Sequence, residues 1–308
     1  MDTATDTTTD ALLGQIVGHY RLDVLLGRGA NAAVYRASDR ATGEAVALRV
    51  FAGDAATDPA FGARFRHAAG AAAALRHPHI LPILDFGEDQ GLAFIARPYA
   101  AVGSLRGRLG APLALAAVVH WLGPIADALD YAHANGVVHG DLKPGNLLLA
   151  ADGRLLLADL GTAHALAASN SLVASARGRH GGTPEYLAPE QALGLPPDGR
   201  TDLYALAVIT YEALTGRPPF RAEGPADTPR MLLLRHLDTA PPAPRALNPT
   251  ITADAEEALL RALAKDPGER FPSGAAFFAA LLDALLSGVM DDAPPAPAAT
   301  RPPCRAST

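Results

Sequence analysis

The spacing of apolar residues changes character near residue 100. Before that point they form short strand-like runs, and a helical pattern occupies residues 61–75. After residue 113 they recur every three or four positions over long stretches, as on one face of a helix. The pattern predicts an α+β fold with two lobes, in which a small antiparallel sheet with one helix precedes a mostly helical half, joined near residues 98–103.

The predicted strands are YRLDVLL (20–26), AAVYRAS (32–38), AVALRVF (45–51), ILPILDFG (80–87) and LAFIARPY (92–99). The four long helical patterns cover residues 113–136, 201–216, 253–266 and 273–288. Three of the four stop at a glycine or just before one, where helices commonly end.

Two segments without this patterning flank the lobes. Residues 1–17 are polar, and residues 291–308 are rich in proline and alanine, so both are predicted to be disordered tails. Between them, residues 18–99 are assigned to the first lobe and residues 100–290 to the second. No repeat of fixed period occurs in the sequence, which excludes solenoids and propellers.

Composition and charge narrow the class of protein. The 308 residues are 49% apolar and 19% charged, enough to bury a substantial core. A formal charge of -6 argues against a general nucleic-acid binder, because such proteins need basic surface to offset phosphate repulsion. Residues 109–126 carry no formal charge, but Asp127 and Asp130 continue the same amphipathic run, so a buried helix is predicted there and no membrane span.

The cysteine content and the first residues both concern the cellular compartment. The single cysteine, Cys304, lies in the proline-rich end, so no internal disulfide forms. The stretch MDTATDTTTD has neither the basic nor the apolar region of a signal peptide. Both features predict a cytoplasmic protein.

Four short motifs carry candidate chemistry. LLGRGANAAVYRA, residues 25–37, places Gly27 and Gly29 in a turn between two strands, where backbone N–H groups can approach phosphate oxygens. Taken alone, this motif is more often an ordinary glycine hairpin. HGDLKPGNLLL, residues 139–149, gathers Asp141, Lys143 and Asn146 in one loop, which supplies a base, a cation and a metal ligand for a phosphoryl group.

The last two motifs complete the series. ADLG, residues 158–161, puts Asp159 at a strand end, where its carboxylate can bind a divalent metal. GTPEYLAPE follows at residues 182–190. In this order and spacing the motifs resemble the protein kinase family, in particular bacterial kinases of the eukaryotic-like Ser/Thr type, over residues 18–288.

The resemblance implies the protein kinase fold and a role for each matching residue. Asp141 is implied to accept the proton of the substrate hydroxyl, Lys143 to steady the γ-phosphate of ATP, and Thr183 to bridge toward both. Asn146 and Asp159 are the implied Mg²⁺ ligands. The positions implied to contact ATP are Leu26, Gly27, Gly29, Ala32, Val34, Ala47, Arg49 and Ala100.

Three further matches are architectural. Asp202 resembles the helix aspartate that anchors the catalytic loop of the family. Glu190 and Arg270 resemble the ion pair that fixes the end of the activation segment.

Two matched positions depart from the family pattern together. AVALRV aligns with the strand whose lysine contacts the α- and β-phosphates and pairs with a glutamate on the first-lobe helix, and Arg49 takes the lysine position. A planar guanidinium is longer and bulkier than an ammonium, so the charge is kept and the geometry changes. The glutamate position is Ala68, and residues 61–76 contain no acidic residue, so both halves of the contact are altered.

Three other positions also differ from the family. Ala32 replaces the third glycine of the phosphate loop. Gly140 replaces the arginine before Asp141, which predicts that control does not run through a phosphorylated activation loop. Arg97 stands where an apolar side chain usually lines the adenine pocket, and it either points outward or takes up space there.

Three functional interpretations remain open. One is an ATP-dependent Ser/Thr protein kinase with impaired catalysis, because base, loop lysine and metal ligands are in place. Another is a pseudokinase that acts as a nucleotide-binding or purely scaffolding module, because Arg49, Ala68 and Arg97 depart from the pattern. A small-molecule kinase is disfavoured, since GTPEYLAPE resembles a peptide-docking segment. No feature names the protein substrate or signalling partner.

Overall fold

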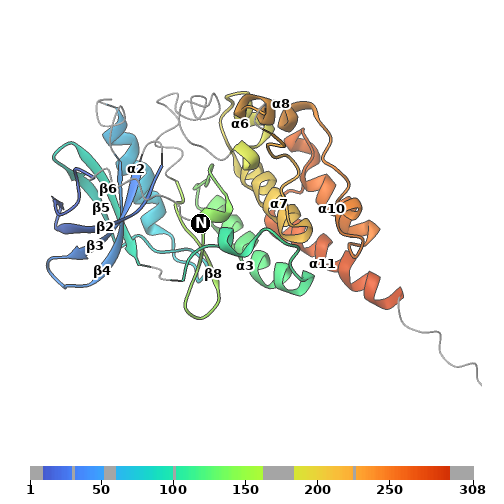
Figure 1. Ribbon diagram of the computed structural model, residues 1–308, viewed down its shortest axis with the longest axis horizontal. Coiled ribbons are helices and arrows are strands. Elements are labelled where there is room, and N and C mark those ends of the chain that lie inside the picture. The colour runs from blue at the N-terminus through green and yellow to red at the C-terminus, as the bar shows by residue number, and fades with distance from the viewer. Residues whose placement is uncertain are drawn as a thin grey trace, which may run out of the picture.

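The first third of the chain contains a six-stranded antiparallel sheet (Figure 1). In the computed structural model, which describes residues 10–29, 32–51, 60–99, 102–161, 184–224 and 227–291, six strands follow the order β1-β2-β3-β4-β6-β5. The strands are β1 (Ile16–Val17), β2 (Tyr20–Arg28), β3 (Ala32–Asp39), β4 (Ala45–Phe51), β5 (Asp85–Asp89) and β6 (Leu92–Pro98).

Helix α2 (Phe61–Ala74) packs against this sheet. Phe61, Phe65 and Ala69 are spaced four residues apart, so they share one face of the helix. That face is buried against Phe51 of β4 and Ile95 of β6.

Two details of the first lobe differ from the sequence prediction. The run at residues 80–87 is a strand only from Asp85 onward, because Pro82 has no N–H to give to a ladder. Ile80 forms an isolated bridge with Leu157 of the other lobe instead. The segment ahead of β2 is the second difference. Residues 10–17, expected to belong to a disordered tail, are folded, and Asp10 accepts hydrogen bonds from the Tyr35 hydroxyl (2.6 Å) and the Arg28 guanidinium (2.7 Å).

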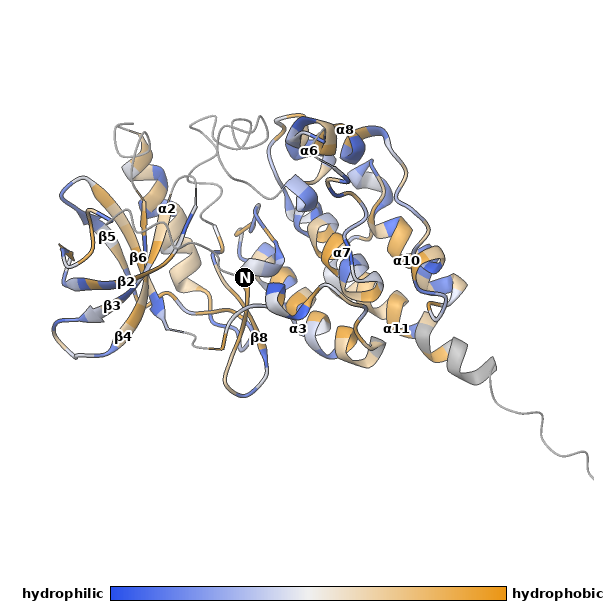
Figure 2. Cartoon of the chain, in the orientation of Figure 1, coloured by the Kyte–Doolittle hydropathy of each residue, from blue (hydrophilic) through white to orange (hydrophobic). Residues whose placement is uncertain are grey.

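Helices build the second lobe, as the sequence predicts (Figure 1). Its elements are η1 (Leu105–Arg108), α3 (Leu115–Ala134), η2 (Pro144–Asn146), β7 (Leu147–Leu149), β8 (Leu155–Leu157), η3 (Pro184–Tyr186), α6 (Pro189–Ala192), α7 (Gly199–Thr215), α8 (Pro229–Asp238), α9 (Pro244–Leu247), α10 (Ala253–Ala262), η4 (Pro267–Glu269) and α11 (Gly274–Asp291). Apolar residues concentrate where α3, α7, α10 and α11 face one another (Figure 2). The α+β prediction with two lobes is confirmed.

Helix α7 runs through the centre of this lobe and is buried along nearly its whole length. Asp198 caps its start by accepting from the N–H groups of Arg200 (2.9 Å) and Thr201 (3.3 Å). It ends at Gly216, whose φ of 81° is left-handed. The Asp198 cap and Gly216 therefore explain where the helix begins and ends.

Replacing Gly216 by alanine is expected to cost about 2 kcal/mol of unfolding free energy, since a residue with a Cβ is strained at this φ. A Cβ at Gly216 would also lie 3.0 Å from Cδ and 3.1 Å from N of Pro112. Gly153→Ala is the matched control, because φ there is 86° and a Cβ would meet nothing within 4 Å. Urea denaturation measures both variants, and equal losses would show that crowding by Pro112 contributes nothing.

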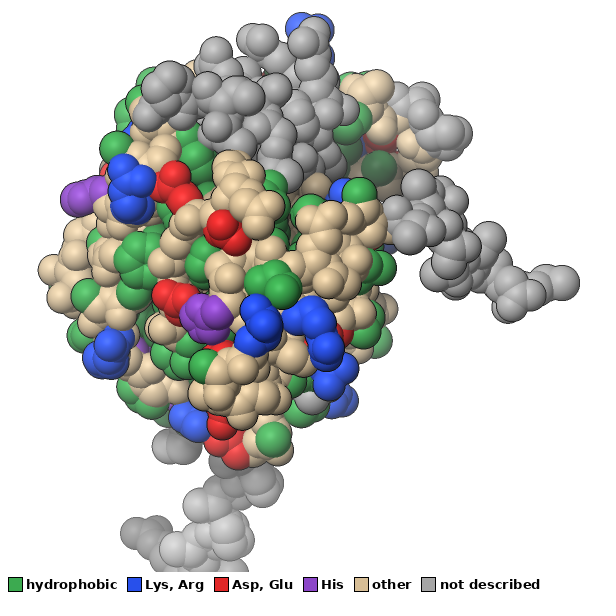
Figure 3. Space-filling view, turned by 90° about the vertical axis from the view of Figure 1, so that its left-hand side faces the viewer, with side chains coloured by type: hydrophobic (Ala, Val, Ile, Leu, Met, Phe, Trp, Pro, Cys, Tyr) green, Lys and Arg blue, Asp and Glu red, His purple; other side chains and the backbone are tan. Residues whose placement is uncertain are grey.

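The surface shows mixed side chains, and residues 109–126 contribute to the core. On the face shown in Figure 3, acidic, basic and apolar side chains are interspersed. Within the described ranges, no helix combines the length and apolar character needed to cross a bilayer. Val118, Leu122 and Ile125 of α3 are buried in the core of the second lobe, as predicted for residues 109–126.

Candidate active site

A cavity of about 420 Å³ lies between the sheet and the first residues of the second lobe. It contains most of the positions that the sequence assigned to a nucleotide. The lining residues are Leu26, Gly27, Val34, Ala47, Arg49, Ile95, Arg97, Gly103, Ser104, Gly145, Asn146, Leu148, Ala158 and Asp159.

Strand register brings the sheet residues of this cavity onto one face. Ala47 and Arg49 are two positions apart on β4, so their side chains point the same way. Arg49 lies opposite Val34 of β3, and Ala47 lies opposite Arg97 of β6. At the end of β2, a Cβ added to Gly27 would meet nothing within 4 Å, so the space above this glycine belongs to the cavity.

Asp202 of α7 binds the loop that carries Asp141, the candidate base. Its carboxylate accepts from the N–H groups of His139 and Gly140, both at 2.8 Å, and it also contacts Nε2 of His133 at 2.8 Å. Gly140 has a φ of 71°, where glycine avoids the strain of a Cβ. The structure thus gives Asp202 the anchoring contacts that the resemblance implied.

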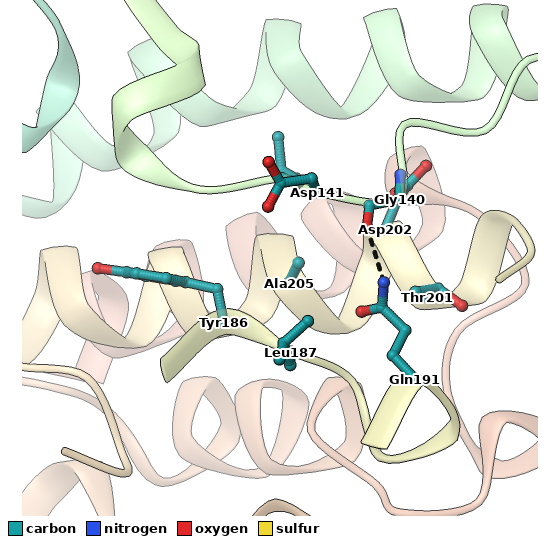
Figure 4. Close-up of a pocket in the computed structure, with 9 residues that line it drawn as sticks. Gly140, Asp141, Tyr186, Leu187, Gln191, Thr201, Asp202 and Ala205 are labelled. Atoms are coloured by element: carbon teal, nitrogen blue, oxygen red, sulfur yellow. Dashed lines mark hydrogen bonds between the residues drawn. The ribbon is translucent and has the colours of Figure 1, made fainter. Parts of the chain in front are cut away.

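The residue that follows the GTPEYLAPE motif contacts the same loop. Gln191 of α6 donates from Nε2 to the Gly140 carbonyl at 2.7 Å and accepts from the Ala188 N–H at 3.1 Å (Figure 4). A cavity of about 10 Å³ that Gly140 and Gln191 help to line has the size of a single water site. Residues 184–192, which we call the docking segment, are therefore tied to the loop that carries Asp141.

Asp141 lies within hydrogen-bond reach of both Lys143 and Asn146. Lys143 Nζ is 2.6 Å from Asp141 Oδ2, and Asn146 Nδ2 donates to the Asp141 carbonyl at 2.8 Å. The Asp141 carboxylate is 37% exposed and Lys143 is 24% exposed, so both groups are accessible to a ligand. A carboxylate and an ammonium side by side can accept a hydroxyl proton and stabilise a neighbouring phosphoryl group.

His139 connects this loop to the ADLG motif, a contact that the sequence did not suggest. Its Nε2 donates to the Ala158 carbonyl at 2.9 Å, and its Nδ1 accepts from the Asp141 N–H at 3.2 Å. Burial lowers the pKa of His139, so the ring is neutral with its proton on Nε2. The backbone of Asp141 is therefore fixed relative to the residue that precedes Asp159.

Asp159 lies between two arginines. Its Oδ2 accepts from Arg49 Nη1 and its Oδ1 accepts from Arg97 Nη1. Asp159 also has a φ of 66°, an uncommon conformation for a residue with a side chain and one that clusters at functional sites. We call Arg49 and Arg97 on this carboxylate the arginine pair.

The Arg97 side chain points into the cavity and not outward to solvent. Its side chain is 7% exposed and points into the cavity, so it occupies space there and does not reach solvent. Burial, with the neighbouring Arg49 charge, lowers the pKa of Arg97 to about 9, which leaves the guanidinium protonated at neutral pH. Burial likewise lowers the pKa of Arg49.

The side chains that line the cavity fit an anionic nucleotide better than a divalent metal. Nε of Arg49 and Nε of Arg97 are buried and have no hydrogen-bond partner among the described residues, so neither guanidinium has all of its donors satisfied. Both oxygens of Asp159 already accept from guanidinium groups, whose two positive charges repel a dication. The described ranges contain no group of three or more acidic, His or Cys side chains placed to hold a metal. This arrangement does not fit Mg²⁺ at Asp159.

Some of the expected site residues lie elsewhere. Gly29, just after β2, donates its N–H to the carbonyl of Ala32, the first residue of β3, at 2.8 Å, and neither residue lines the cavity. Ala100 and Thr183 lie outside the described residues. Ala68 packs against the Phe51 and Ile95 cluster, and its backbone carbonyl would be 3.4 Å from a Cβ at Gly161 of the ADLG motif.

An ion pair in the core supports the docking segment. Arg270 binds Glu190 through two parallel hydrogen bonds, Nη1 to Oε1 at 2.9 Å and Nη2 to Oε2 at 2.8 Å. Thr201 Oγ1 donates to the same carboxylate at 2.8 Å. Arg270 is 2% exposed and Glu190 is 7% exposed, so this pair is excluded from solvent.

Comparison with known proteins identifies the family. Residues 20–278 match the family model described as protein kinase domain. The chain belongs to the protein kinase family. This kinase-family chain is 38% identical over 262 residues to "Probable serine/threonine-protein kinase SCO3848" of Streptomyces coelicolor. It is 39% identical over 289 residues to "Serine/threonine-protein kinase Pkn1" of Myxococcus xanthus.

The extent of these matches differs between relatives and solved structures. The matched residues make up 83% and 91% of this kinase-family chain but 38% and 40% of the two relatives, so the chain spans about two fifths of their length. A crystal structure of the PknI kinase domain of Mycobacterium tuberculosis superposes with a TM-score of 0.67 at 32% identity. That match covers 88% of this chain and 97% of the PknI domain chain.

Proposed function

We propose that this kinase-family chain is a Ser/Thr protein kinase that uses ATP, with impaired catalysis. The observation that carries the proposal is the contact between Asp141 and Lys143, 2.6 Å apart on a loop that also supplies Asn146 to the nucleotide cavity. Protein kinases generally use ATP and Mg²⁺, and the relatives above are described as serine/threonine-protein kinases.

The chemistry assigned to this chain needs one base and several cations. The substrate hydroxyl oxygen attacks the γ-phosphorus of ATP, its proton passes to the Asp141 carboxylate, and ADP leaves. Lys143 and the arginine pair offset the charge on the phosphate oxygens. Because Mg²⁺ does not fit at Asp159 in this arrangement, no step is assigned to a metal. The arginine contacts disagree with the prediction of Asp159 as a Mg²⁺ ligand, and Asn146 as a metal ligand stays a prediction.

A protein substrate is favoured by the docking segment. Residues 184–192 are linked to the catalytic loop by the hydrogen bond from Gln191 to Gly140. A substrate bound along this segment would therefore be positioned relative to Asp141, and positioning is one of the two main contributions an enzyme makes to phosphoryl transfer.

The test is transfer of labelled phosphate from ATP to a generic basic protein, followed by phosphoamino-acid analysis. Labelled phosphoserine or phosphothreonine is expected, above the background of an Asp141→Asn preparation. Incorporation equal to that background would overturn the proposal.

A pseudokinase is the second candidate, and the altered contact at Arg49 and Ala68 favours it. The double variant Arg49→Lys with Ala68→Glu installs the lysine and the glutamate that the family pattern places at these two positions. For an impaired kinase we expect the double variant to transfer phosphate about 10- to 100-fold faster than wild type, the scale of a corrected positioning contact. Transfer rates of the two single variants, compared with that of the double variant, give the coupling energy between the two positions.

The outcomes separate the two candidates. A wild type at the Asp141→Asn background beside an active double variant would establish a pseudokinase. A wild type as active as the double variant would show that Arg49 needs no glutamate.

A further inference from the structure

We propose that the arginine pair takes the place of the divalent metal, so that this cavity binds ATP without Mg²⁺. The inference rests on the proposed function in taking ATP as the ligand. In this arrangement two arginine side chains, and no metal ion, offset the negative charge of the phosphates.

The geometry that supports the inference comes from strand register. Arg49 and Arg97 are diagonal neighbours on one face of adjacent strands, because Arg49 pairs with Ile95 and Arg97 pairs with Ala47. The two guanidinium groups converge on Asp159, and each takes a different carboxylate oxygen. Asp159 reaches them with the left-handed φ of 66°, so the backbone after β8 is shaped to present this carboxylate.

The charges of the three groups favour an anion. One carboxylate neutralises one guanidinium and leaves a net positive charge at the wall of the cavity. ATP without a metal carries the two negative charges that Mg²⁺ would otherwise neutralise, so it gains more from this wall than the metal complex does. A dication entering beside Asp159 would have to displace at least one arginine from a site where both are mostly shielded from solvent, with 19% and 7% of their side chains exposed.

Unused hydrogen-bond donors point in the same direction. Each arginine contacts Asp159 through Nη1, and each Nε is buried without a partner among the described residues. A guanidinium offers five N–H donors and binds phosphate oxygens in a bidentate manner. A phosphate oxygen that reaches an Nε group on binding would satisfy that donor while Asp159 keeps the guanidinium in place.

The test is calorimetric titration of the full chain with ATP, once in EDTA and once with excess MgCl₂. We expect the dissociation constant in EDTA to be lower than, or within about threefold of, the value in Mg²⁺. A value in EDTA more than about tenfold higher than in Mg²⁺ would overturn the inference and leave the proposed function standing. Absence of ATP binding in both conditions would overturn both.

The variant Arg97→Met tests the residues directly. It should raise the dissociation constant in EDTA by about tenfold or more, and Mg²⁺ should recover much of the loss, because one oxygen of Asp159 is then released. Arg66→Met is the matched control, since Arg66 pairs with Glu88 on the surface at 2.5 Å and is 61% exposed. It should leave both constants unchanged.

A second variant covers the case in which Arg97→Met does not fold, as shown by its thermal unfolding curve. Arg49→Gln removes the other guanidinium from a different strand and should have the same effect in EDTA. Unchanged binding in EDTA by a folded variant of either position would contradict the role of the arginine pair.

Discussion

Asp141→Asn is expected to lower the rate of phosphoryl transfer by about 10²- to 10⁴-fold, the usual contribution of a positioned general base. Asparagine keeps the shape of the side chain but cannot accept the hydroxyl proton. The fold of the loop should survive, because its hydrogen bonds to His139 and Asn146 use the backbone of residue 141.

The rate is measured with labelled ATP on a basic protein substrate, beside ATP binding by calorimetry. Binding should change little, since Asp141 does not line the nucleotide cavity. Asp152→Asn is the matched control, because Asp152 pairs with Arg154 on the surface and is 52% exposed. A transfer rate within about twofold of wild type in Asp141→Asn would contradict the assignment of the base.

Arg270→Met is expected to cost about 3–5 kcal/mol of unfolding free energy, because it leaves the buried Glu190 carboxylate without its cation. Burial alone raises the pKa of Glu190, but the hydrogen bonds and charge of Arg270 outweigh it and hold the pKa below its ordinary value. In the wild type the contribution of this carboxylate is therefore present above its unfolded pKa and is lost as the pH falls through its folded pKa.

Urea denaturation at neutral pH measures the loss. Arg154→Met, which removes a surface pair, should cost no more than about 1 kcal/mol. The double variant Arg270→Met with Glu190→Leu should recover part of the loss, since no buried charge is then left unpaired. A cost for Arg270→Met as small as that of Arg154→Met would contradict a structural role for the buried pair.

The sequence predicts those parts of the fold that depend on local pattern. The helix that ends at Gly216 follows from apolar spacing and a glycine stop, and both are properties of neighbouring residues. The run at residues 80–87 misled the prediction because Pro82 breaks the ladder of an otherwise apolar stretch. Asp10 was assigned to a tail because its partners, Tyr35 and Arg28, are distant in sequence.

The same distinction applies to the site. Asp141, Lys143 and Asn146 lie within six residues, so their proximity in the structure follows from one loop. The contacts of Asp159 do not follow from a single loop, because its partners are 110 residues away at Arg49 and 62 residues away at Arg97. The sequence shows both arginines as departures from the family, but their meeting point depends on strand register and on the backbone of Asp159.

The arginine pair is tested most directly by a crystal structure of the chain grown with a non-hydrolysable ATP analogue and excess Mg²⁺. We expect phosphate oxygens of the analogue to contact the guanidinium groups of Arg49 and Arg97, with both groups still on Asp159 and no metal bound to that carboxylate. A Mg²⁺ ion bound between Asp159 and Asn146, with the arginines turned away, would contradict this.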